Sequence, residues 1–371
     1  MRRREILALP LLAARPSPAA SPLTSTLEEL VAEGAVVGAQ AVYGQGAEAS
    51  EIAIGLVEPG GARKVGAATQ FCVGSVSKPL ASAAIVGLAD EGKLDLDAKA
   101  DAYLPAYSHL RLASGESAEA PTLRQLLAHR GGVYSQHAGP MRPSQKRWIR
   151  DFRLTLAEAV EGIAGEPLAS APGSAYAYSG AGYCVLGAAA AAAVGEPFEQ
   201  ILRRRVVEPL ALERTGYFPD PAEKDIAAGA DPRTGKPHPE TPHLLGAELR
   251  LALVGGSVYS TAGELARFAR MALAKGAAPG GRRALSERAW REWTRQPFPE
   301  QPYGHGWGLL LDASGRVRRL RHNGALAASR AILQADLDSG GYAAVTYTVA
   351  KLNGEAEKRL GAAVTRTLDY L

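Results

Sequence analysis

The sequence predicts an α+β fold in which one antiparallel sheet, flanked by helices, is built from both ends of the chain. Runs of β-branched and apolar residues occur near the start and again near the end, whereas helical periodicity dominates the residues between them. Two groups of strands separated in this way can share one sheet only if the helical part is inserted between them. We therefore expect a sheet subdomain over about residues 25–80 and 251–371 and a mostly helical subdomain over about 81–250.

Each end of the chain supplies strands to this sheet. Helical spacing over 26–33, ending at Gly34, leads into strand-like runs over 36–43 and 51–56 and a shorter one over 69–73. The C-terminal end returns to strand patterns and closes with a helix: strands 308–311, 317–321, 328–334 and 342–348, then helix 355–371. The residues between the two ends predict these helices: 75–91 with Gly92 as its C-cap, 123–128, 154–163, 182–194 and 198–207.

The distribution of charge argues against nucleic-acid binding. The 371 residues carry a formal net charge of +4, and the first twenty residues contain four arginines against one glutamate. The rest of the chain is therefore close to neutral, whereas a nucleic-acid-binding domain needs a basic face within its fold. Hydrophobic residues make up 46% of the chain and charged residues 22%, which is ordinary for a globular protein.

The first residues have the pattern of an export signal. Arg2–Arg4 precede a short apolar run, Ile6–Ala14, and prolines and small residues follow up to Ala20. We therefore expect residues 1–24 to be a signal peptide and leader and the mature protein to be periplasmic or extracellular, with a frayed amphipathic N-terminus as the alternative. The first residues also resemble a twin-arginine signal, so both the Sec route and the twin-arginine route of export stay open. No run reaches the roughly 18 apolar residues of a transmembrane helix, so we expect no stable membrane span.

Cysteine and histidine usage predicts no metal or cofactor site. Cys72 and Cys184 lie in apolar surroundings and are expected to be buried thiols, although a single bridge between them stays open in an oxidising compartment. His238 and His243 have a spacing similar to metal ligands, but three prolines around them exclude the helix that such a pair requires.

The strongest local signal is Ser75-Val76-Ser77-Lys78, at the start of a predicted helix. Positions three apart share one helix face, so the Lys78 amine can reach the Ser75 hydroxyl. A serine hydroxyl is a weak nucleophile until a base takes its proton, and lysine serves as that base only if burial lowers its pKa from about 10.4. The apolar neighbours of the motif favour such burial. Taken alone, the motif also fits an N-capping serine followed by a solvated lysine.

Two later motifs raise the specificity of the pattern. The first is the run from Pro172 to Tyr183, which contains Tyr178-Ser179-Gly180, and the second is His322-Asn323-Gly324-Ala325. With Ser-x-x-Lys, their order resembles the superfamily of class C β-lactamases, DD-peptidases and family VIII esterases, in which Ser-x-x-Lys, Tyr-x-Asn and Lys/His-x-Gly follow one another. Supporting phrases cover nearly the whole chain after the leader: Glu91–Asp97, Leu104-Pro105, Thr122–His129, Pro209-Leu210 and Gly255–Ala262.

The resemblance implies roles for these residues. Ser75 would be the acylated nucleophile, Lys78 its base, and Tyr178 the proton shuttle between Ser75 and the leaving group, although Tyr176 and Tyr183 lie close enough in sequence to compete. The backbone amides of Ser75 and Ala325 would form the oxyanion hole. The positions implied to bind substrate are Gly180, His322, Asn323 and Gly324.

One position departs from the family pattern. Gly180 stands where Tyr-x-Asn has its asparagine, whose amide contacts the acylamide of β-lactams and peptides and helps to hold the lysine. Its loss favours ester hydrolysis over penicillin or peptide hydrolysis.

We therefore expect a serine hydrolase, free of metal and cofactor, that acts through an acyl-enzyme on ester or amide bonds of a small-molecule or peptide-like substrate, with esterase activity favoured. The alternative is a non-catalytic penicillin- or peptidoglycan-binding sensor of the same fold. The absence of a Gly-x-Ser-x-Gly elbow disfavours the α/β-hydrolase route. Oligomeric state and natural substrate stay open.

Overall fold

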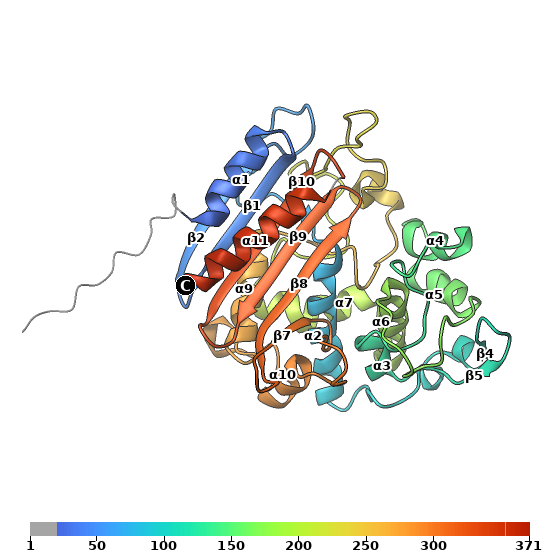
Figure 1. Cartoon of the computed structure of the whole chain (residues 1–371). Helices are drawn as coiled ribbons and strands as arrows, with labels where there is room; N and C mark the ends of the chain where they lie inside the picture. The colour runs from blue at the N-terminus through green and yellow to red at the C-terminus, as the bar shows by residue number, and fades with distance from the viewer. Residues whose placement is uncertain (1–20, 353) are drawn as a thin grey trace, which may run out of the picture.

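The computed structural model describes residues 21–352 and 354–371. Its centre is a six-stranded antiparallel sheet in the order β2-β1-β10-β9-β8-β7 (Figure 1). The strands from the two ends of the chain meet where β1 pairs with β10, from Val36 opposite Val349 to Gln45 opposite Gly341. The prediction that both ends build one sheet is therefore confirmed. The strand bounds are β1 Val36–Gln45, β2 Glu48–Gly55, β7 Gly308–Leu311, β8 Val317–Leu326, β9 Ser329–Asp336 and β10 Gly341–Val349.

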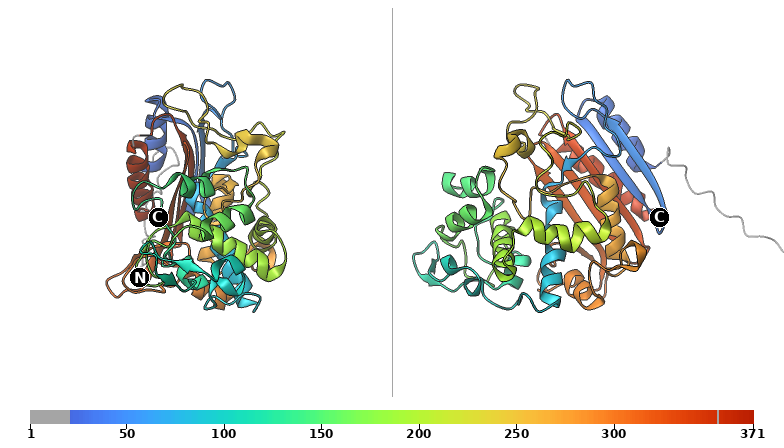
Figure 2. Two further views of the ribbon diagram at one scale, coloured as in Figure 1. Left: turned by 90° about the vertical axis from the view of Figure 1, so that its right-hand side faces the viewer. Right: turned by 180° about the vertical axis from the view of Figure 1, so that it is seen from behind.

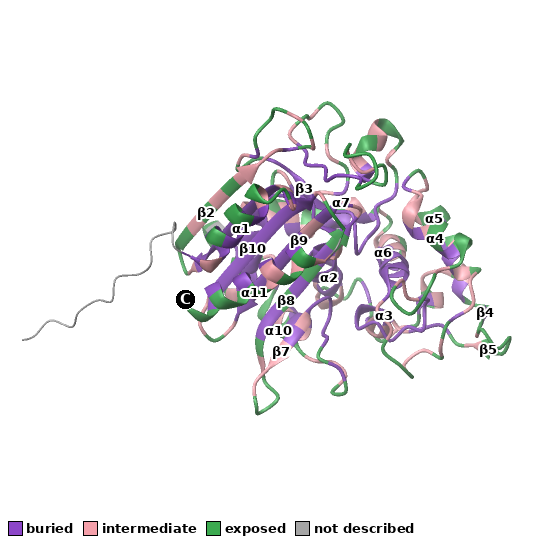
Figure 3. Cartoon of the chain, turned by 45° about the horizontal axis from the view of Figure 1, so that its top comes forward, coloured by how far each residue is buried: buried purple, intermediate pink, exposed green. Residues whose placement is uncertain are grey.

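Two terminal helices cover one face of the sheet, α1 (Pro22–Ala32) and α11 (Glu355–Asp369). Figure 2 shows both on the same side of the strands, and the strands between the layers are buried in Figure 3. Along β10, Ala343, Val345 and Tyr347 belong to the apolar core under these helices, whereas Tyr342 and Ala344 belong to the core on the opposite face. Because side chains alternate along a strand, one strand serves both cores.

The opposite face of the sheet carries α9 (Ala262–Leu273), which packs against β9 and β10, and the helix that follows the Ser75 turn, α2 (Ser77–Asp90). Next to α2 stand α10 (Glu287–Thr294) and α6 (Gly180–Val194). The helices α3, α4 and α5, with the hairpin of β4 and β5, form the part of the molecule beside the sheet in Figure 1, whereas α7 lies behind the sheet. The bounds of these elements and of α8 are α3 Leu123–Leu127, α4 Pro143–Arg150, α5 Leu156–Ala164, α7 Phe198–Leu202 and α8 Glu208–Leu210, with β4 Leu110–Arg111 and β5 Ser117–Ala118.

Short helical turns complete the chain: 3-10 turns η2 Gly74–Val76, η3 Ala100–Ala102, η4 Pro105–Tyr107, η6 Pro242–Glu248 and η7 Pro279–Gly281, and a π turn η5 Arg203–Val207. Within the described part of the chain, no single helix has the length and apolar character to cross a membrane. Only the pair Gly180–Val194 and Phe198–Leu210, bent by 82°, passes that test jointly.

Three sequence-based expectations differ from the structure. The strand expected over 69–73 is only Phe71–Cys72 (β3), and it pairs with Tyr259–Ser260 (β6) outside the main sheet. The strand expected to end at residue 321 continues to Leu326, because its pairing with β9 runs on to the Leu326–Ser329 turn. The helix expected from residue 75 starts as the turn η2. Most of the predicted leader, residues 1–20, lies outside the described residues.

Candidate active site

A tight turn carries Ser75 between β3 and α2. Gly74 has a φ of +52°, and a Cβ at this position would lie 2.3 Å from the Ala325 nitrogen, so only glycine fits. The Ser77 hydroxyl donates to the Gly74 carbonyl at 2.6 Å and accepts from the Val258 amide at 3.0 Å. These bonds fix the turn, and Ser75 is left partly open to solvent beside buried neighbours.

Lys78 lies one turn along the chain from Ser75 and is buried, with 1% of its surface exposed. Its Nζ is 3.2 Å from Ser75 Oγ and 2.8 Å from the Gly255 carbonyl oxygen. Burial lowers the pKa of Lys78 to about 7, because the charged ammonium loses hydration that one carbonyl does not replace. At neutral pH a large fraction of the lysine is therefore the neutral amine, which can accept the proton of Ser75.

Tyr178 is the tyrosine that shares this site. Lys78 Nζ lies 4.5 Å from the centre of its ring. Burial raises the pKa of Tyr178 and a hydrogen bond with Ser75 opposes that rise, so the phenol keeps its proton at neutral pH. The competing residues have other positions: the Tyr183 hydroxyl donates to the Leu127 carbonyl at 2.9 Å, and Tyr176 is 43% exposed.

His129 anchors the segment that carries Tyr178. Its Nδ1 accepts a hydrogen bond from the Ser179 amide at 3.1 Å, and the Ser179 hydroxyl donates to the Tyr134 carbonyl at 2.7 Å. The His129 ring also packs 4.2 Å from the Tyr178 ring, centre to centre. Because Nδ1 accepts, the proton of the neutral His129 ring sits on Nε2.

Strand β8 brings the third motif against the Ser75 turn. A Cβ at Gly324 would lie 1.9 Å from the Val73 carbonyl oxygen and 3.1 Å from the Ser75 nitrogen, so glycine permits the strand to pack on the turn. This contact places the amides of Ser75 and Ala325 side by side. Asn323 is exposed, whereas its neighbours His322 and Gly324 are buried, so the Asn323 side chain points to the other face of the strand.

His322 is buried and has a partner at each ring nitrogen. Its Nδ1 is 2.7 Å from the Asn323 carbonyl oxygen, and its Nε2 is 3.0 Å from the Tyr303 hydroxyl. Burial and then the charge of Lys78 lower the pKa of His322 to about 3. Sequence reasoning missed Tyr303, because no periodic or motif signal marks it.

The space beside Gly180 is occupied. The Gly180 amide, at the start of α6, donates to Gln136 Oε1 at 2.9 Å, and a Cβ at Gly180 would meet the Gln136 amide at 3.4 Å. A side-chain amide therefore stands next to the position at which the family has its asparagine. Gln136 was also missed, and only its place four residues after the glycine pair Gly131-Gly132 could have drawn attention to it.

Other singled-out residues lie away from this chemistry. His305 is fully buried, with Nδ1 2.9 Å from the Glu292 carbonyl oxygen. Cys72 and Cys184 are free and buried, as predicted, and do not form a bridge. His243 contacts the Tyr259 hydroxyl. Among the residues described, no group of three histidine, cysteine or acidic side chains is arranged to hold a metal ion.

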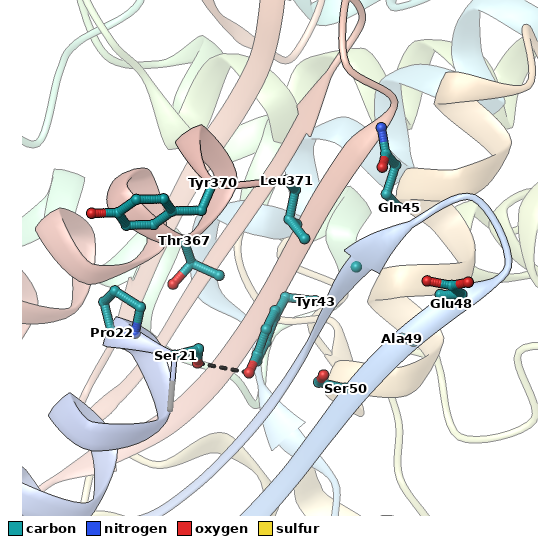
Figure 4. A pocket seen from close by; sticks show the side chains of 11 residues that line it. Ser21, Pro22, Tyr43, Gln45, Glu48, Ala49, Ser50, Thr367, Tyr370 and Leu371 are labelled. Atoms are coloured by element: carbon teal, nitrogen blue, oxygen red, sulfur yellow. Dashed lines mark hydrogen bonds between the residues drawn. The ribbon is translucent and has the colours of Figure 1, made fainter. Parts of the chain in front are cut away.

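A separate cavity of about 550 Å³ lies between the start of α1, the β1–β2 hairpin and the C-terminus (Figure 4). Two serines, Ser21 and Ser50, line it, and the Ser21 hydroxyl accepts a 2.6 Å hydrogen bond from the Tyr43 hydroxyl. The described residues that line this cavity include no lysine or histidine. The described lining of this cavity therefore lacks a serine–lysine pair like that of Ser75 and Lys78.

The chain matches known proteins over most of its length. A family model described as Beta-lactamase matches residues 23–365. Penicillin-binding protein 4 of Amycolatopsis lactamdurans is 29% identical over 317 residues, 80% of this chain and 76% of that protein. Esterase EstB of Burkholderia gladioli is 31% identical over 228 residues, 59% of this chain and 56% of that protein.

Among solved structures, EstCE1, a hydrolase with promiscuous acyltransferase activity, has a TM-score of 0.78 at 21% identity and covers 94% of this chain and 98% of that one. This likeness shows a shared fold and confirms the predicted fold class. Because the family model spans nearly all of the described residues, the chain belongs to the β-lactamase family and is a hydrolase of that family, as its three motifs predicted.

Proposed function

We propose that this protein is an esterase-type serine hydrolase that forms an acyl-enzyme on Ser75. The observation that carries the proposal is the pair Ser75 and Lys78, with Oγ and Nζ 3.2 Å apart and the pKa of the lysine lowered to about 7. A general base is most effective when its pKa lies near the working pH. The Tyr178 phenol contacts both groups, through a hydrogen bond with Ser75 and through its ring, whose centre lies 4.5 Å from Lys78 Nζ, and so supports the same chemistry.

The proposed reaction has two halves. Neutral Lys78 accepts the Ser75 proton while Oγ bonds to the substrate carbonyl carbon, and the amides of Ser75 and Ala325 donate to the developing oxyanion. The carbon–oxygen bond to the leaving group then breaks, and the leaving oxygen takes a proton through Tyr178, which is replenished from Lys78. In the second half water attacks the acyl carbon and gives its proton to the same base. The bond between Ser75 Oγ and the acyl carbon then breaks, and Oγ takes this proton back from Lys78, which restores the free serine and the neutral amine.

A fluorophosphonate probe followed by mass spectrometry tests this assignment. We expect the adduct on Ser75, and Ser75→Ala should lose both the adduct and the hydrolysis of p-nitrophenyl esters. Ser314→Ala, on an exposed turn, is the matched control and should keep both. An adduct on Ser77 or Ser179 with an active Ser75→Ala protein would refute the proposal. A lasting adduct with penicillin and no ester turnover would favour the non-catalytic sensor.

We propose further that short-chain esters are preferred over β-lactams. Gly180 provides no side chain for an acylamide arm, and the neighbouring Gln136 amide is already bonded to the Gly180 backbone. A penicillin or peptide thus loses hydrogen bonds worth about 0.5–1.5 kcal/mol each, whereas a small ester does not use them. The name of one relative, esterase EstB, agrees with this preference.

Comparing kcat/KM for nitrocefin and p-nitrophenyl butyrate tests the preference. The native protein should favour the ester, and Gly180→Asn should shift the ratio towards nitrocefin. The backbone φ at Gly180 lies outside the left-handed region, and the nearest obstacle is the movable Gln136 amide, so asparagine fits. Faster turnover of nitrocefin than of the ester by the native protein would contradict the proposal.

We also propose that the protein is exported. The helix α1 begins at Pro22 and is capped by the Ser21 side chain, so cleavage before Ser21 would leave the folded part intact. The last residues of the expected leader, Pro22–Thr24, belong to α1. N-terminal sequencing of protein expressed in a bacterium should find a mature start between Ala14 and Thr24, outside the cytoplasm. Active protein that keeps Met1–Leu12 would refute export.

A further inference from the structure

Tyr303 forms a hydrogen bond with Nε2 of His322, the one ring nitrogen that is not already bonded to the backbone. The Asn323 carbonyl oxygen, 2.7 Å from Nδ1, can only accept, so Nδ1 carries the proton. In the neutral ring Nε2 is then the acceptor, and the Tyr303 hydroxyl, 3.0 Å away, donates to it. Both residues are buried, so water does not compete for this bond.

The pair stands beside the reacting groups. His322 is on β8, two residues before Gly324, which packs on the Ser75 turn. The centre of its ring lies 6.2 Å from that of Tyr178, and Tyr303 is also 6.2 Å from Tyr178. The pair therefore lies on the β8 side of the reacting groups.

The titratable groups that face His322 keep it uncharged. Lys78 on α2 and His129 act on it electrostatically, and Tyr178 and Tyr303 are protonated phenols. Burial and Lys78 both disfavour a positive imidazole here, and no carboxylate is among these neighbours. The β8 edge of the site thus offers an anion neither a charge nor a free ring N–H.

We propose that Tyr303 is a specificity-determining residue, which by engaging His322 Nε2 keeps the β8 edge of the site neutral and selects substrates that carry no carboxylate there. The selected class is neutral esters or amides. The inference rests on the proposed function for its kinetic test, although the Tyr303–His322 hydrogen bond can be tested without turnover.

One other cation near the cleft is a rival anchor for anions. Arg150, the last residue of α4, is partly shielded from solvent and has no hydrogen-bond or ion-pair partner within the described residues. Its charge acts on Lys78 and His137. It approaches from α4 rather than from β8, so substitutions can separate the two anchors.

Two matched ester pairs test the inference. p-Nitrophenyl butyrate and p-nitrophenyl hemisuccinate differ by a carboxylate in the acyl part, and phenyl butyrate and 4-carboxyphenyl butyrate differ by one in the leaving group. For at least one pair the native protein should favour the neutral member by about tenfold in kcat/KM, since an unpaired charge is excluded from a neutral site. The hydrolysis of the neutral esters themselves reports on the proposed function, and the ratio within each pair reports on Tyr303.

Tyr303→Phe should reduce this discrimination about twofold at about pH 5 and less at about pH 8. Nε2 then lacks its donor and protonates more readily, while burial and the charge of Lys78 still oppose the proton. Titration of Lys78 changes both members of a pair alike and cancels in the ratio. The matched control is Tyr107→Phe, since the Tyr107 hydroxyl is buried without a hydrogen-bond partner within the described residues. It should leave the ratio unchanged.

A readout independent of catalysis uses the ¹⁵N shifts of His322. The native protein should show the neutral Nδ1–H tautomer down to about pH 5, and Tyr303→Phe should shift Nε2 and raise the pKa of His322. A charged His322 at about pH 6 in the native protein would overturn the proposal. So would preferential hydrolysis of both anionic esters, and loss of that preference in Arg150→Met would assign the anion to α4 instead.

Discussion

Two buried basic groups, Lys78 and His322, flank Ser75. Burial lowers the pKa of both, but only the lysine keeps a pKa at which it can act as a base near neutral pH. On the α2 side, burial lowers the pKa of Lys78 to about 7, whereas on the β8 side burial and Lys78 lower the pKa of His322 to about 3. Lys78 Nζ contacts one backbone acceptor, the Gly255 carbonyl oxygen, and its other contact is with Ser75 Oγ. His322 has both nitrogens occupied, by Tyr303 and the Asn323 carbonyl.

The difference shows that burial alone does not make a catalytic base. A buried base becomes useful when its shifted pKa falls within the working pH range and one lone pair faces the group to be deprotonated. Lys78 meets both conditions. His322 meets neither condition. We propose instead that its contribution on β8 is to keep that edge of the site uncharged. Four experiments can break or sharpen this contrast.

The largest effect is expected from Lys78→Arg. A guanidinium keeps the positive charge but, with a pKa above about 12, cannot accept the Ser75 proton near neutral pH. We expect kcat/KM for p-nitrophenyl butyrate to fall by about 10³-fold, within the range of general base catalysis. Near-native rates would mean that Lys78 only supplies charge, and the distinction from His322 would then fail.

The pH dependence of the native enzyme comes next. Because neutral Lys78 is the active form and its pKa is about 7, kcat/KM should rise with pH through that value. Below the midpoint the decrease should be about tenfold per pH unit. Burial raises the pKa of Tyr178, so no falling limb from this phenol is expected below about pH 10. A midpoint near pH 4, or none, would contradict the role of Lys78.

Stability should reveal the cost of burying Lys78. The pKa of the lysine falls from 10.5 to about 7 on folding, so between these values the unfolded chain binds the extra proton and the free energy of unfolding rises with pH. The full difference corresponds to about 5 kcal/mol and opposes folding below about pH 7. Lys78→Met should therefore be more stable than the native protein at about pH 6, and the gap should narrow towards about pH 10. Urea unfolding of both proteins at each pH measures it, and a constant gap would exclude a buried neutral amine.

The sequence predicted those features of the fold and the site that depend on residues close together in the chain. The three-residue spacing of Ser75 and Lys78, and the strands at both chain ends, depend on backbone periodicity, which a single sequence displays. The contact of Tyr303 with His322 spans 19 residues and that of Gln136 with Gly180 spans 44, and no pattern encodes either. The sequence predicts the loss of the asparagine amide at position 180, but it does not predict that the Gln136 amide lies beside this glycine. The boundary of the inserted subdomain stays a prediction.

The smallest effect is expected from His322→Gln, which tests the inactive half of the comparison. Glutamine is neutral, and its amide can accept from Tyr303 through oxygen and donate through nitrogen to the Asn323 carbonyl, so both hydrogen bonds survive. Because His322 is already uncharged at neutral pH, we expect kcat/KM for p-nitrophenyl butyrate to fall less than about fivefold and the midpoint near pH 7 to stay in place. Lys78→Arg, assayed in the same experiment, gives the much larger decrease in kcat/KM with which this small decrease is compared. A loss as large as that of Lys78→Arg, or a displaced midpoint, would mean that His322 takes part in the proton transfer, and the two sides of Ser75 would then form one coupled base.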